Sequence, residues 1–415
     1  MHFGLLTQWY PPEPGPAALS GDLAEGLVAR GHQVDVVTGF PNYPTGRLAH
    51  GYRIQRHQRD RAGDLTVHRV ALYPAHSAST ASRLANYGSF AISAAVSGHR
   101  ILSRCDALWV NYSPITVSLA MWAARRLREV PVVTYVADLW PDTVYASGFG
   151  GEGKLGSLAR QGLDRWCAAI YSSSEAVIHI ARGAGDVLSE RGVPRDRLHY
   201  VPTWANEDLA AQPGRSLRGD LGLTADDVVL VYAGAMGPAQ GLDSLIDATA
   251  DLDDRRLTVL LAGGGIAEKE LKQRAAQRGC SRIRFLGRLP QDRMPDLMAT
   301  ADAVYVSLTD HELSAITLPS KTQAGLAAGK AMLVAAHGDV AREVRDARCG
   351  YIAASGDRAG IAAMLSELSR VGRPGAAALG RRAQTHYRTH FSTERGIDAI
   401  EEILVASARR QEARP

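Results

Sequence analysis

Cysteine is scarce in this sequence, with four copies in 415 residues, and the four are far apart. No C-x-x-C pair occurs and the histidines do not cluster, so the spacing predicts no structural zinc site. The absence of paired cysteines also predicts a reducing compartment such as the cytoplasm. The four are Cys105, Cys167, Cys280 and Cys349.

Long apolar runs and an excess of one charge are also missing. A membrane-spanning helix needs about 18 apolar residues in a row, and no stretch approaches that length. The first apolar stretch ends at Thr7-Gln8 and lacks a basic flank, which favours a strand over a signal peptide. The net charge of +4 fits anionic small molecules or a loose contact with an anionic membrane, and is too weak to indicate nucleic acid.

Short apolar runs alternate with helical patterns along the whole chain, which is typical of parallel sheets covered on both faces. The length predicts two domains. We therefore predict an α/β fold with two doubly wound, Rossmann-like domains, and ligands at the carboxyl ends of strands in a cleft between them. The predicted strands are His2–Thr7, Gln33–Thr38, Ala107–Asn111, Val130–Tyr135, Ala176–Ile180 and Leu198–Val201, then Val228–Ala233, Leu257–Ala262, Ile283–Leu286, Ala303–Ser307 and Ala331–Ala335.

Two segments have no single interpretation, and a third is a candidate linker. Gly39–Tyr73 shows no clean period and carries a basic run, so it is either a loop that touches an acceptor or a solvated insertion. Arg83–Ile101 is either a surface helix for membrane contact or a core helix. Thr203–Gly222 carries Pro213, Gly214 and Gly219 and is the predicted linker.

Glycine turns follow predicted strands at three places. Gly15 precedes the first predicted helix, and Gly234 to Gly241 follow the first strand of the second half. Glycine lets backbone N–H groups approach a phosphate, so both turns predict a diphosphate site. Gly263–Gly265 is either part of the same site or a flexible turn.

A lysine stands in the first turn of a predicted helix at Leu318-Pro319-Ser320-Lys321. The helix dipole disfavours a cation at this end, so Lys321 predicts a bound anion, with Ser320 as the helix cap. A solvent-facing lysine is the alternative.

Asp138 follows another predicted strand and could orient or deprotonate an acceptor, although an acid at a strand end is often only a turn residue. The acidic run at Asp251–Asp254 lies away from the strand ends where ligands are expected. It therefore predicts a solvated turn and no metal site.

Taken together, these segments resemble the family 4 glycosyltransferases of the GT-B architecture. Within that family they are most similar to the fucosamine and fucose transferases of bacterial surface polysaccharide assembly. The segments that carry the resemblance are Tyr10–Ala18, Gly39–Pro44, Asp138–Pro141, Tyr232–Leu242, Phe285–Pro290 and Pro319–Lys321.

The resemblance implies a retaining transfer without metal or cofactor, from a UDP- or GDP-sugar to an acceptor. It implies an acceptor-side domain at 1–203, a nucleotide-sugar domain at 204–390 and a helix at 391–415 returning to the first domain. Asp138 and Lys321 would be catalytic. The donor diphosphate would bind to Gly15, Gly234, Ala235, Met236, Gly237, Gln240, Ser320 and Lys321, the base to Arg288 and Leu289, and the acceptor near Glu13, Asn42, Tyr43 and Trp140.

The sequence departs from the family pattern at several positions. Ala137 stands where a histidine is common, and two family glutamates align with Ile316 and Ala324. The usual arginine and lysine of the glycine loop align with Ala235 and Gln240. These departures keep two alternatives open, an inactive GT-B-shaped nucleotide-binding protein and a sugar-nucleotide epimerase.

The acceptor has two interpretations. One is a polyprenyl-linked glycan at the inner membrane face, which would place a cytoplasmic protein at the membrane periphery. The other is a small specialised metabolite with an easily ionised nucleophile such as a thiol. The missing histidine at Ala137 fits the thiol, because a thiol needs little help from a base.

Overall fold

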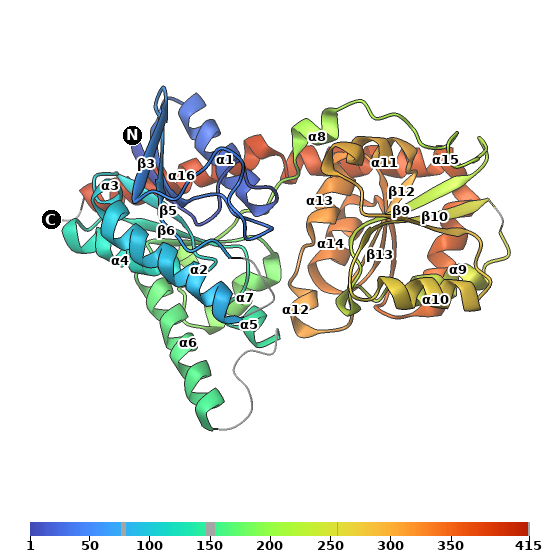
Figure 1. The fold of residues 1–415 in the computed structure, drawn as a ribbon. Helices are drawn as coiled ribbons and strands as arrows, with labels where there is room; N and C mark the ends of the chain where they lie inside the picture. Colours follow the sequence, from blue (N-terminus) through green and yellow to red (C-terminus); the bar gives the residue numbers. More distant parts are fainter. Residues whose placement is uncertain (76–79, 147–153, 255, 414–415) are drawn as a thin grey trace. The chain divides into compact units, whose positions relative to one another are not determined.

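The computed structural model describes residues 1–75, 80–146, 154–254 and 256–413 (Figure 1). The chain forms two compact units. The first unit combines Met1–Pro202 with Glu394–Pro415, and the second is Thr203–Thr393. Each unit is built on one sheet with helices around it, as the alternation of apolar runs predicts.

The sheet of the first unit has the strand order β3-β4-β2-β1-β5-β6-β7-β8. All its pairings are parallel except that of β3 with β4. The strands are β1 (His2–Leu6), β2 (Gln33–Gly39), β3 (His57–Ala62), β4 (Leu65–Val70), β5 (Ala107–Asn111), β6 (Val132–Val136), β7 (Ala176–His179) and β8 (Leu198–Tyr200).

Helical segments connect these strands. They are α1 (Pro16–Ala29), α2 (Thr80–Ser93), the π-helical turn η1 (Ala94–Gly98), α3 (His99–Leu102), η2 (Ile115–Val117), α4 (Ser118–Leu127), α5 (Asp142–Ala146), α6 (Lys154–Ser172), α7 (Arg182–Glu190) and η3 (Arg195–Arg197). The core holds the apolar side chains of β1, β2 and β5, with Leu5, Val36 and Trp109 fully buried. A continuous apolar run on each of these strands is what burial on both faces requires.

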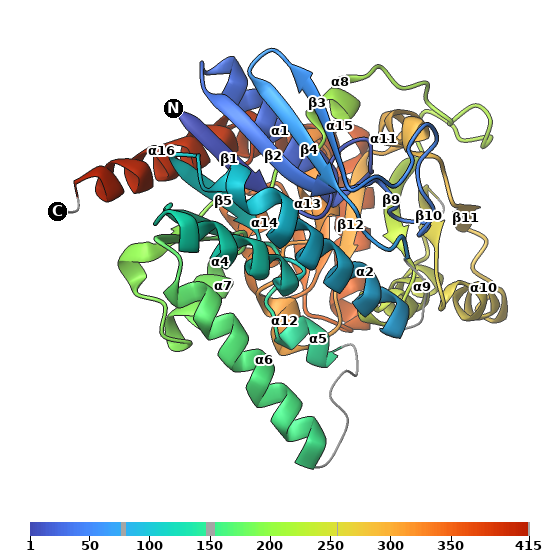
Figure 2. The ribbon, with the colours of Figure 1, turned by 60° about the vertical axis from the view of Figure 1, so that its left-hand side comes forward.

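The predicted loop at Gly39–Tyr73 is wrong in part, because it contains the hairpin β3–β4. Figure 2 shows this hairpin beside β2, at the edge of the sheet. Five of the six β3 residues are exposed, and β4 buries the polar His68 and Arg69. Neither strand therefore has the apolar pattern by which a strand is recognised in sequence.

The sheet of the second unit has the order β11-β10-β9-β12-β13-β14, and every pairing is parallel. Its strands are β9 (Val228–Ala235), β10 (Leu257–Gly264), β11 (Ile283–Gly287), β12 (Ala303–Ser307), β13 (Ala331–Ala335) and β14 (Gly350–Ala353). Alternate residues of β9 face two separate clusters. Leu230 and Tyr232 belong to one cluster, while Val229 and Val231 belong to the other. The short β14 was not predicted from the sequence.

The helices of the second unit are α8 (Glu207–Ala211), η4 (Pro238–Gln240), α9 (Leu242–Asp251), α10 (Glu268–Gln277), η5 (Gln291–Arg293), α11 (Met294–Thr300), α12 (Glu312–Ala315), α13 (Ser320–Ala327), α14 (Gly338–Ala347) and α15 (Arg358–His390). Helix α8 lies within the predicted linker. A positive φ at Gly372 and the following Pro374 produce a kink inside α15.

The last helix, α16 (Thr393–Glu412), packs within the first unit although it follows the second in sequence. Arg30 of α1 forms ion pairs with Asp398 and Glu401, and His32 Nε2 lies 2.7 Å from Glu401. Gly26 gives α16 room, because a Cβ there would lie 2.4 Å from Ile397 Cδ1. The predicted C-terminal helix is present. The last two residues of its predicted segment lie outside the described part of the chain.

Candidate functional site

The two glycine turns of the second unit lie side by side. Strands β9 and β10 pair in register to their ends, so that Gly234 faces Gly263 and Ala235 faces Gly264. A Cβ on Gly263 would lie 1.9 Å from the Gly234 carbonyl oxygen, and both residues have positive φ. Gly263 is thus a glycine because the first turn packs directly against it. This packing accounts for a glycine at position 263. Neither a flexible turn nor a bound ligand is needed to explain it.

The backbone beyond Ala235 is held by internal hydrogen bonds. The Met236 N–H donates to the Gly264 carbonyl at 3.0 Å, and the Gly237 N–H donates to Gln240 Oε1 at 3.0 Å. The side chain of Met236 is fully buried in the core. In this structure Met236 and Gln240 therefore fix the shape of the loop. Gly234 and Ala235 are exposed, as are Pro238 and Ala239 further along the loop.

Lys321 lies directly over this loop. A Cβ on Gly234 would be 3.2 Å from Lys321 Nζ, so the ammonium rests against the Gly234 backbone. Nζ donates to the Tyr232 hydroxyl at 2.9 Å and lies 4.1 Å from the centre of that ring. The Tyr232 hydroxyl in turn donates to the Ala235 carbonyl. Tyr232 therefore couples the position of the lysine to the shape of the loop.

No carboxylate pairs with Lys321 among the residues that the structure describes. Burial alone lowers the pKa of its ammonium from 10.5 to about 8. A half-buried cation without a counter-ion is costly, and an anion bound beside it would remove that cost. The solvent-facing alternative for this lysine does not fit its position.

The helix that carries Lys321 begins one residue earlier, at Ser320. Its N-cap is Pro319, and no side chain caps the first turn. The predicted capping role of Ser320 is wrong, because Ser320 already has helical backbone and is the first residue of the helix. No side chain therefore competes with an anion for the backbone N–H groups of the helical turn that carries Lys321.

The predicted base-binding residues lie beyond β11. Arg288 is exposed, and its Nε would be 3.0 Å from a Cβ on Gly264, so it stands next to the second glycine turn. Leu289 packs partly against the core. At the positions of the two family glutamates, Ile316 is half-buried and Ala324 is exposed, and neither can bind a ribose hydroxyl through a carboxylate.

In the first unit, Gly15 is the N-cap of α1. Its φ of 72° belongs to the left-handed region that favours glycine, and no side chain caps the helix. A Cβ on Gly15 would lie 4.0 Å from the ring of Tyr43. The ring of Trp9 lies 6.2 Å from that of Tyr43 and 6.4 Å from that of Tyr87. An aromatic group therefore stands at the uncapped end of α1.

Glu13 ties the loop after β1 to the loop after β2. One of its carboxylate oxygens accepts the N–H groups of Asn42 at 2.7 Å and Tyr43 at 2.8 Å, and the other accepts the Tyr10 N–H at 3.2 Å. Burial raises the pKa of Glu13, and these three hydrogen bonds act in the opposite direction. Glu13 therefore positions the backbone of the two loops relative to each other. Asn42 is likewise buried and accepts a hydrogen bond from Asn86.

Asp138 follows β6 with an exposed side chain. Desolvation by the surrounding protein raises the pKa of its carboxyl, and Ser113 acts in the opposite direction. Burial is the main cause of the raised pKa of Tyr87; Arg83 lowers that pKa, and the negative charge of Asp138 adds a smaller raising effect. A carboxylate with a raised pKa is a better proton acceptor near neutral pH than an ordinary aspartate.

The fully buried Tyr112 holds the backbone of the Asp138 loop through hydrogen bonds of its hydroxyl. Its hydroxyl donates to the Asp138 carbonyl at 2.8 Å and accepts the Trp140 N–H at 2.8 Å. Arg191 donates to the Trp140 carbonyl at 2.8 Å and forms an ion pair with Asp142. Trp140 is therefore fixed through its backbone, and its half-buried ring faces outward in part.

Sequence reasoning assigned no role to Tyr232 or Tyr112. Both are single tyrosines near a strand end, and a buried tyrosine in such a position is usually core. Only the fold shows that each hydroxyl reaches back to a predicted site residue.

The acidic run at Asp251–Asp254 is a turn whose carboxylates pair with arginines, such as Asp251 with Arg278.

Comparison with known proteins gives the class of protein. Residues 15–204 match a family described as "Glycosyl transferase 4-like domain", and residues 227–370 match "Glycosyl transferases group 1". The chain is 28% identical over 329 residues to the putative colanic acid biosynthesis glycosyl transferase WcaI of Escherichia coli. That match covers 77% of this chain and 79% of WcaI.

The fold is similar to solved structures of the same class. Sucrose-phosphate synthase of Thermosynechococcus elongatus matches with a TM-score of 0.70 at 17% identity, over 97% of this chain and 98% of the synthase. HepE of Anabaena, solved in complex with UDP-glucose, matches with a TM-score of 0.67 at 18% identity, over 98% of this chain and all of HepE. The chain is a glycosyltransferase with the GT-B fold, built from a transferase 4-like domain and a group 1 domain.

We predict that Tyr112→Phe loosens the Asp138 loop. The variant leaves the Asp138 carbonyl and the Trp140 N–H without their buried partner, which costs about 1–3 kcal/mol of unfolding free energy. Urea unfolding followed by circular dichroism measures this cost. Tyr145→Phe is the matched control, because the Tyr145 hydroxyl bonds at an exposed position. Equal stability of the two variants would contradict the role given to Tyr112.

Proposed function

We propose that this glycosyltransferase moves a sugar from a UDP- or GDP-sugar to its acceptor with retention at the anomeric carbon and without a metal ion. The observation that carries the proposal is the ammonium of Lys321, which lies against the exposed Gly234 and pairs with no carboxylate of the described residues. This arrangement suits the diphosphate of a nucleotide sugar. HepE, which has a similar fold, was solved with UDP-glucose and so favours UDP.

In the proposed reaction, the bond between the anomeric carbon and the diphosphate oxygen breaks. The acceptor atom forms its bond on the same face of the sugar, and its proton passes to the leaving diphosphate or, when Asp138 acts as the general base, to the Asp138 carboxylate. Negative charge grows on the diphosphate during this step. Lys321 and the uncapped first turn of α13 stabilise that charge electrostatically, which is the work a divalent cation performs in other transferases.

Asp138 is proposed to orient or deprotonate the acceptor. Its raised pKa and its exposed side chain suit this task, and Tyr112 holds its backbone in place. No histidine precedes it, since position 137 is alanine. The carboxylate would therefore act on the acceptor without an adjacent imidazole.

We predict that one nucleoside diphosphate stabilises the protein in the presence of EDTA. At a concentration of a hundred times Kd, ligand binding contributes about 2.7 kcal/mol of stability. Melting temperatures with UDP, GDP, CDP, TDP and ADP, each against the same EDTA buffer without nucleotide, rank the bases.

Lys321→Gln removes a charge-assisted contact and weakens binding of the nucleotide roughly 10-fold to 150-fold. Lys269→Gln, at an exposed lysine of the same unit, is the matched control.

The pH dependence of binding provides a second readout of the same variant. The nucleotide-free ammonium of Lys321 loses its proton near pH 8, and a bound diphosphate raises its pKa. Affinity is therefore constant below pH 8 and falls by up to about tenfold per pH unit above it. The Lys321→Gln variant shows no such fall. A flat profile in the wild-type protein, or a requirement for a divalent cation, would contradict the proposal.

We predict that Asp138→Asn lowers kcat roughly 100-fold to 10,000-fold, because a general base contributes that much. The affinity for the nucleotide stays unchanged, since Asp138 belongs to the first unit and the diphosphate site to the second. Steady-state transfer assays with the donor identified above measure this effect. Asp186→Asn, in an exposed ion pair with Arg195, is the control. Wild-type turnover by Asp138→Asn would exclude the role.

The acceptor that we favour is a lipid-linked glycan, reached by contact with an anionic membrane surface. No described helix is long and apolar enough to cross a membrane. Along α2 and η1, however, Leu84, Ile92 and Val96 are 52%, 61% and 59% exposed, at spacings of about two turns and one turn of a helix. Phe90 of the same helix is fully buried, so one face packs in the core and another presents apolar side chains. WcaI, whose name places it in colanic acid biosynthesis, supports a polysaccharide pathway.

We predict that the protein sediments with vesicles of mixed zwitterionic and anionic phospholipid. The double variant Ile92→Ser, Val96→Ser loses this binding, because it removes apolar area from the exposed face. Leu127→Ser, 57% exposed on α4, is the matched control. If wild-type protein stays in the supernatant, a small soluble acceptor such as a thiol becomes the better proposal.

A further inference from the structure

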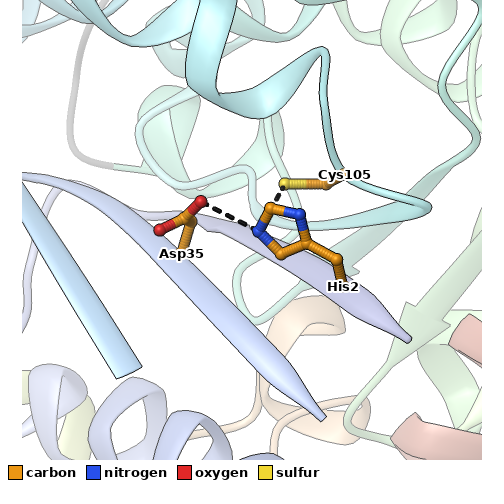
Figure 3. Close-up of side chains that lie close together, drawn as sticks. All are labelled: His2, Asp35 and Cys105. Carbon is orange, nitrogen blue, oxygen red and sulfur yellow. Dashed lines mark hydrogen bonds and ion pairs between the residues drawn. The ribbon is translucent and has the colours of Figure 1, made fainter. Parts of the chain in front are cut away.

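Three chemically reactive side chains meet at the opposite edge of the first sheet from Gly15 and Asp138. His2 begins β1, and Asp35 lies near the start of β2. Cys105 lies two positions before the first residue of β5. His2 Nε2 is 2.8 Å from Asp35 Oδ2 and 3.7 Å from Cys105 Sγ. Figure 3 shows the imidazole lying next to both the carboxylate and the sulfur.

The order of the strands produces this meeting. Strands β2, β1 and β5 are neighbours, and Asp35 pairs in register with Gly4. A Cβ on Gly4 would lie 3.0 Å from Cys105 Sγ and 2.5 Å from Leu108 Cδ2. Glycine at this position therefore leaves the space over β1 that the thiol occupies. A larger residue at position 4 would displace the sulfur from its two partners.

We propose that His2, Asp35 and Cys105 form a binding site for a single Zn²⁺ or similar transition-metal ion. The three donor atoms all lie within 4.8 Å of one another. Donors on a tetrahedral zinc ion, at bond lengths of about 2.0–2.3 Å, lie about 3.3–3.8 Å apart. Shifts of about 1 Å would bring these three to that spacing. They leave the fourth position for water, and the sugar transfer does not involve this site.

The donor types select the class of ion. A thiolate and an imidazole favour zinc and related transition metals, whereas magnesium and calcium prefer oxygen ligands. When the ion binds, the Sγ–H bond of Cys105 breaks, its proton passes to solvent, and a sulfur–metal bond forms. One thiolate and one carboxylate then balance the two positive charges of the ion, with His2 neutral.

The surroundings resemble the outer shell of a metal site. The second carboxylate oxygen of Asp35 lies 3.1 Å from His68 Nε2, and His68 Nδ1 lies 3.1 Å from His57 Nε2. Outer hydrogen bonds of this kind hold ligating groups in orientation. The side chains of His2 and Asp35 are 22% and 14% exposed, while Cys105 is 1% exposed. An ion can therefore reach the site from the His2 side.

The test uses the untagged full-length protein, treated with a chelator that is then removed, and titrated with Co²⁺ followed by Zn²⁺. We expect one Co²⁺ per chain with a thiolate-to-cobalt charge-transfer band, and displacement of that cobalt by zinc. Cys105→Ser abolishes the band. Cys167→Ser, at another buried thiol of the same unit, keeps it. Zinc also raises the melting temperature of wild-type protein and leaves that of Cys105→Ser unchanged.

Two further variants keep the proposal testable if Cys105→Ser folds poorly. His2→Gln changes a partly exposed ligand and weakens binding at least tenfold, and His68→Gln weakens it roughly 10-fold to 100-fold through the outer shell. The proposal is overturned if cobalt gives no thiolate band, or if the band survives in Cys105→Ser. It is also overturned if binding is lost in His57→Gln and His68→Gln but kept in His2→Gln and Cys105→Ser, which would place the ion on the two stacked histidines.

Discussion

Parallel strands have their carboxyl ends at the same side of a sheet, and this constraint brings together the loops of the proposed transfer site within each unit. In the second unit, β9 and β10 run in register to their last residues, so two glycine turns meet and support one another. In the first unit, the loops after β1, β2 and β6 carry Gly15, Asn42 and Asp138 toward the same edge. Without parallel pairing, these residues, which are far apart in the chain, would have no common position.

Two buried tyrosines hold charged groups in place at these strand ends through hydrogen bonds of their hydroxyls. Tyr232 links the ammonium of Lys321 to the carbonyl of Ala235, and Tyr112 links the carbonyl of Asp138 to the N–H of Trp140. In each case one hydroxyl holds a strand-end loop in the low-dielectric interior, where a hydrogen bond is strong. The charged groups therefore need little reorganisation when a ligand binds, which is the condition for electrostatic stabilisation of a transition state.

The carboxyl ends and the amino ends of the strands in the first sheet carry different side chains. The carboxyl edge carries the aromatic group around Tyr43 and the carboxylate of Asp138, and it serves the proposed acceptor. The amino edge carries His2, Asp35 and Cys105 on three adjacent strands. An ion held there would join those strands near their starts, so it would stabilise the unit without entering the sugar transfer.

The sequence by itself determined the α/β class and most of the strands. Ala107–Asn111, Ala303–Ser307 and Ala331–Ala335 have the bounds that their apolar runs predict, because a strand buried on both faces must be apolar throughout. It also singled out Lys321, since a lysine in the first turn of a helix opposes the helix dipole. The edge strand β3 was missed because it needs no apolar run, and β4 was missed because its buried residues include the polar His68 and Arg69.

Only the tertiary structure decided how separated side chains meet. Tyr232 and Lys321 are 89 positions apart, and His2 and Cys105 are 103 apart. The sequence spacing of the cysteines predicted no metal site, whereas the sheet places Cys105 beside a histidine and a carboxylate. Spacing along the chain reveals a site when its ligands share one helix or loop. Here strand order and register bring the ligands together, and both result from the packing of the whole sheet.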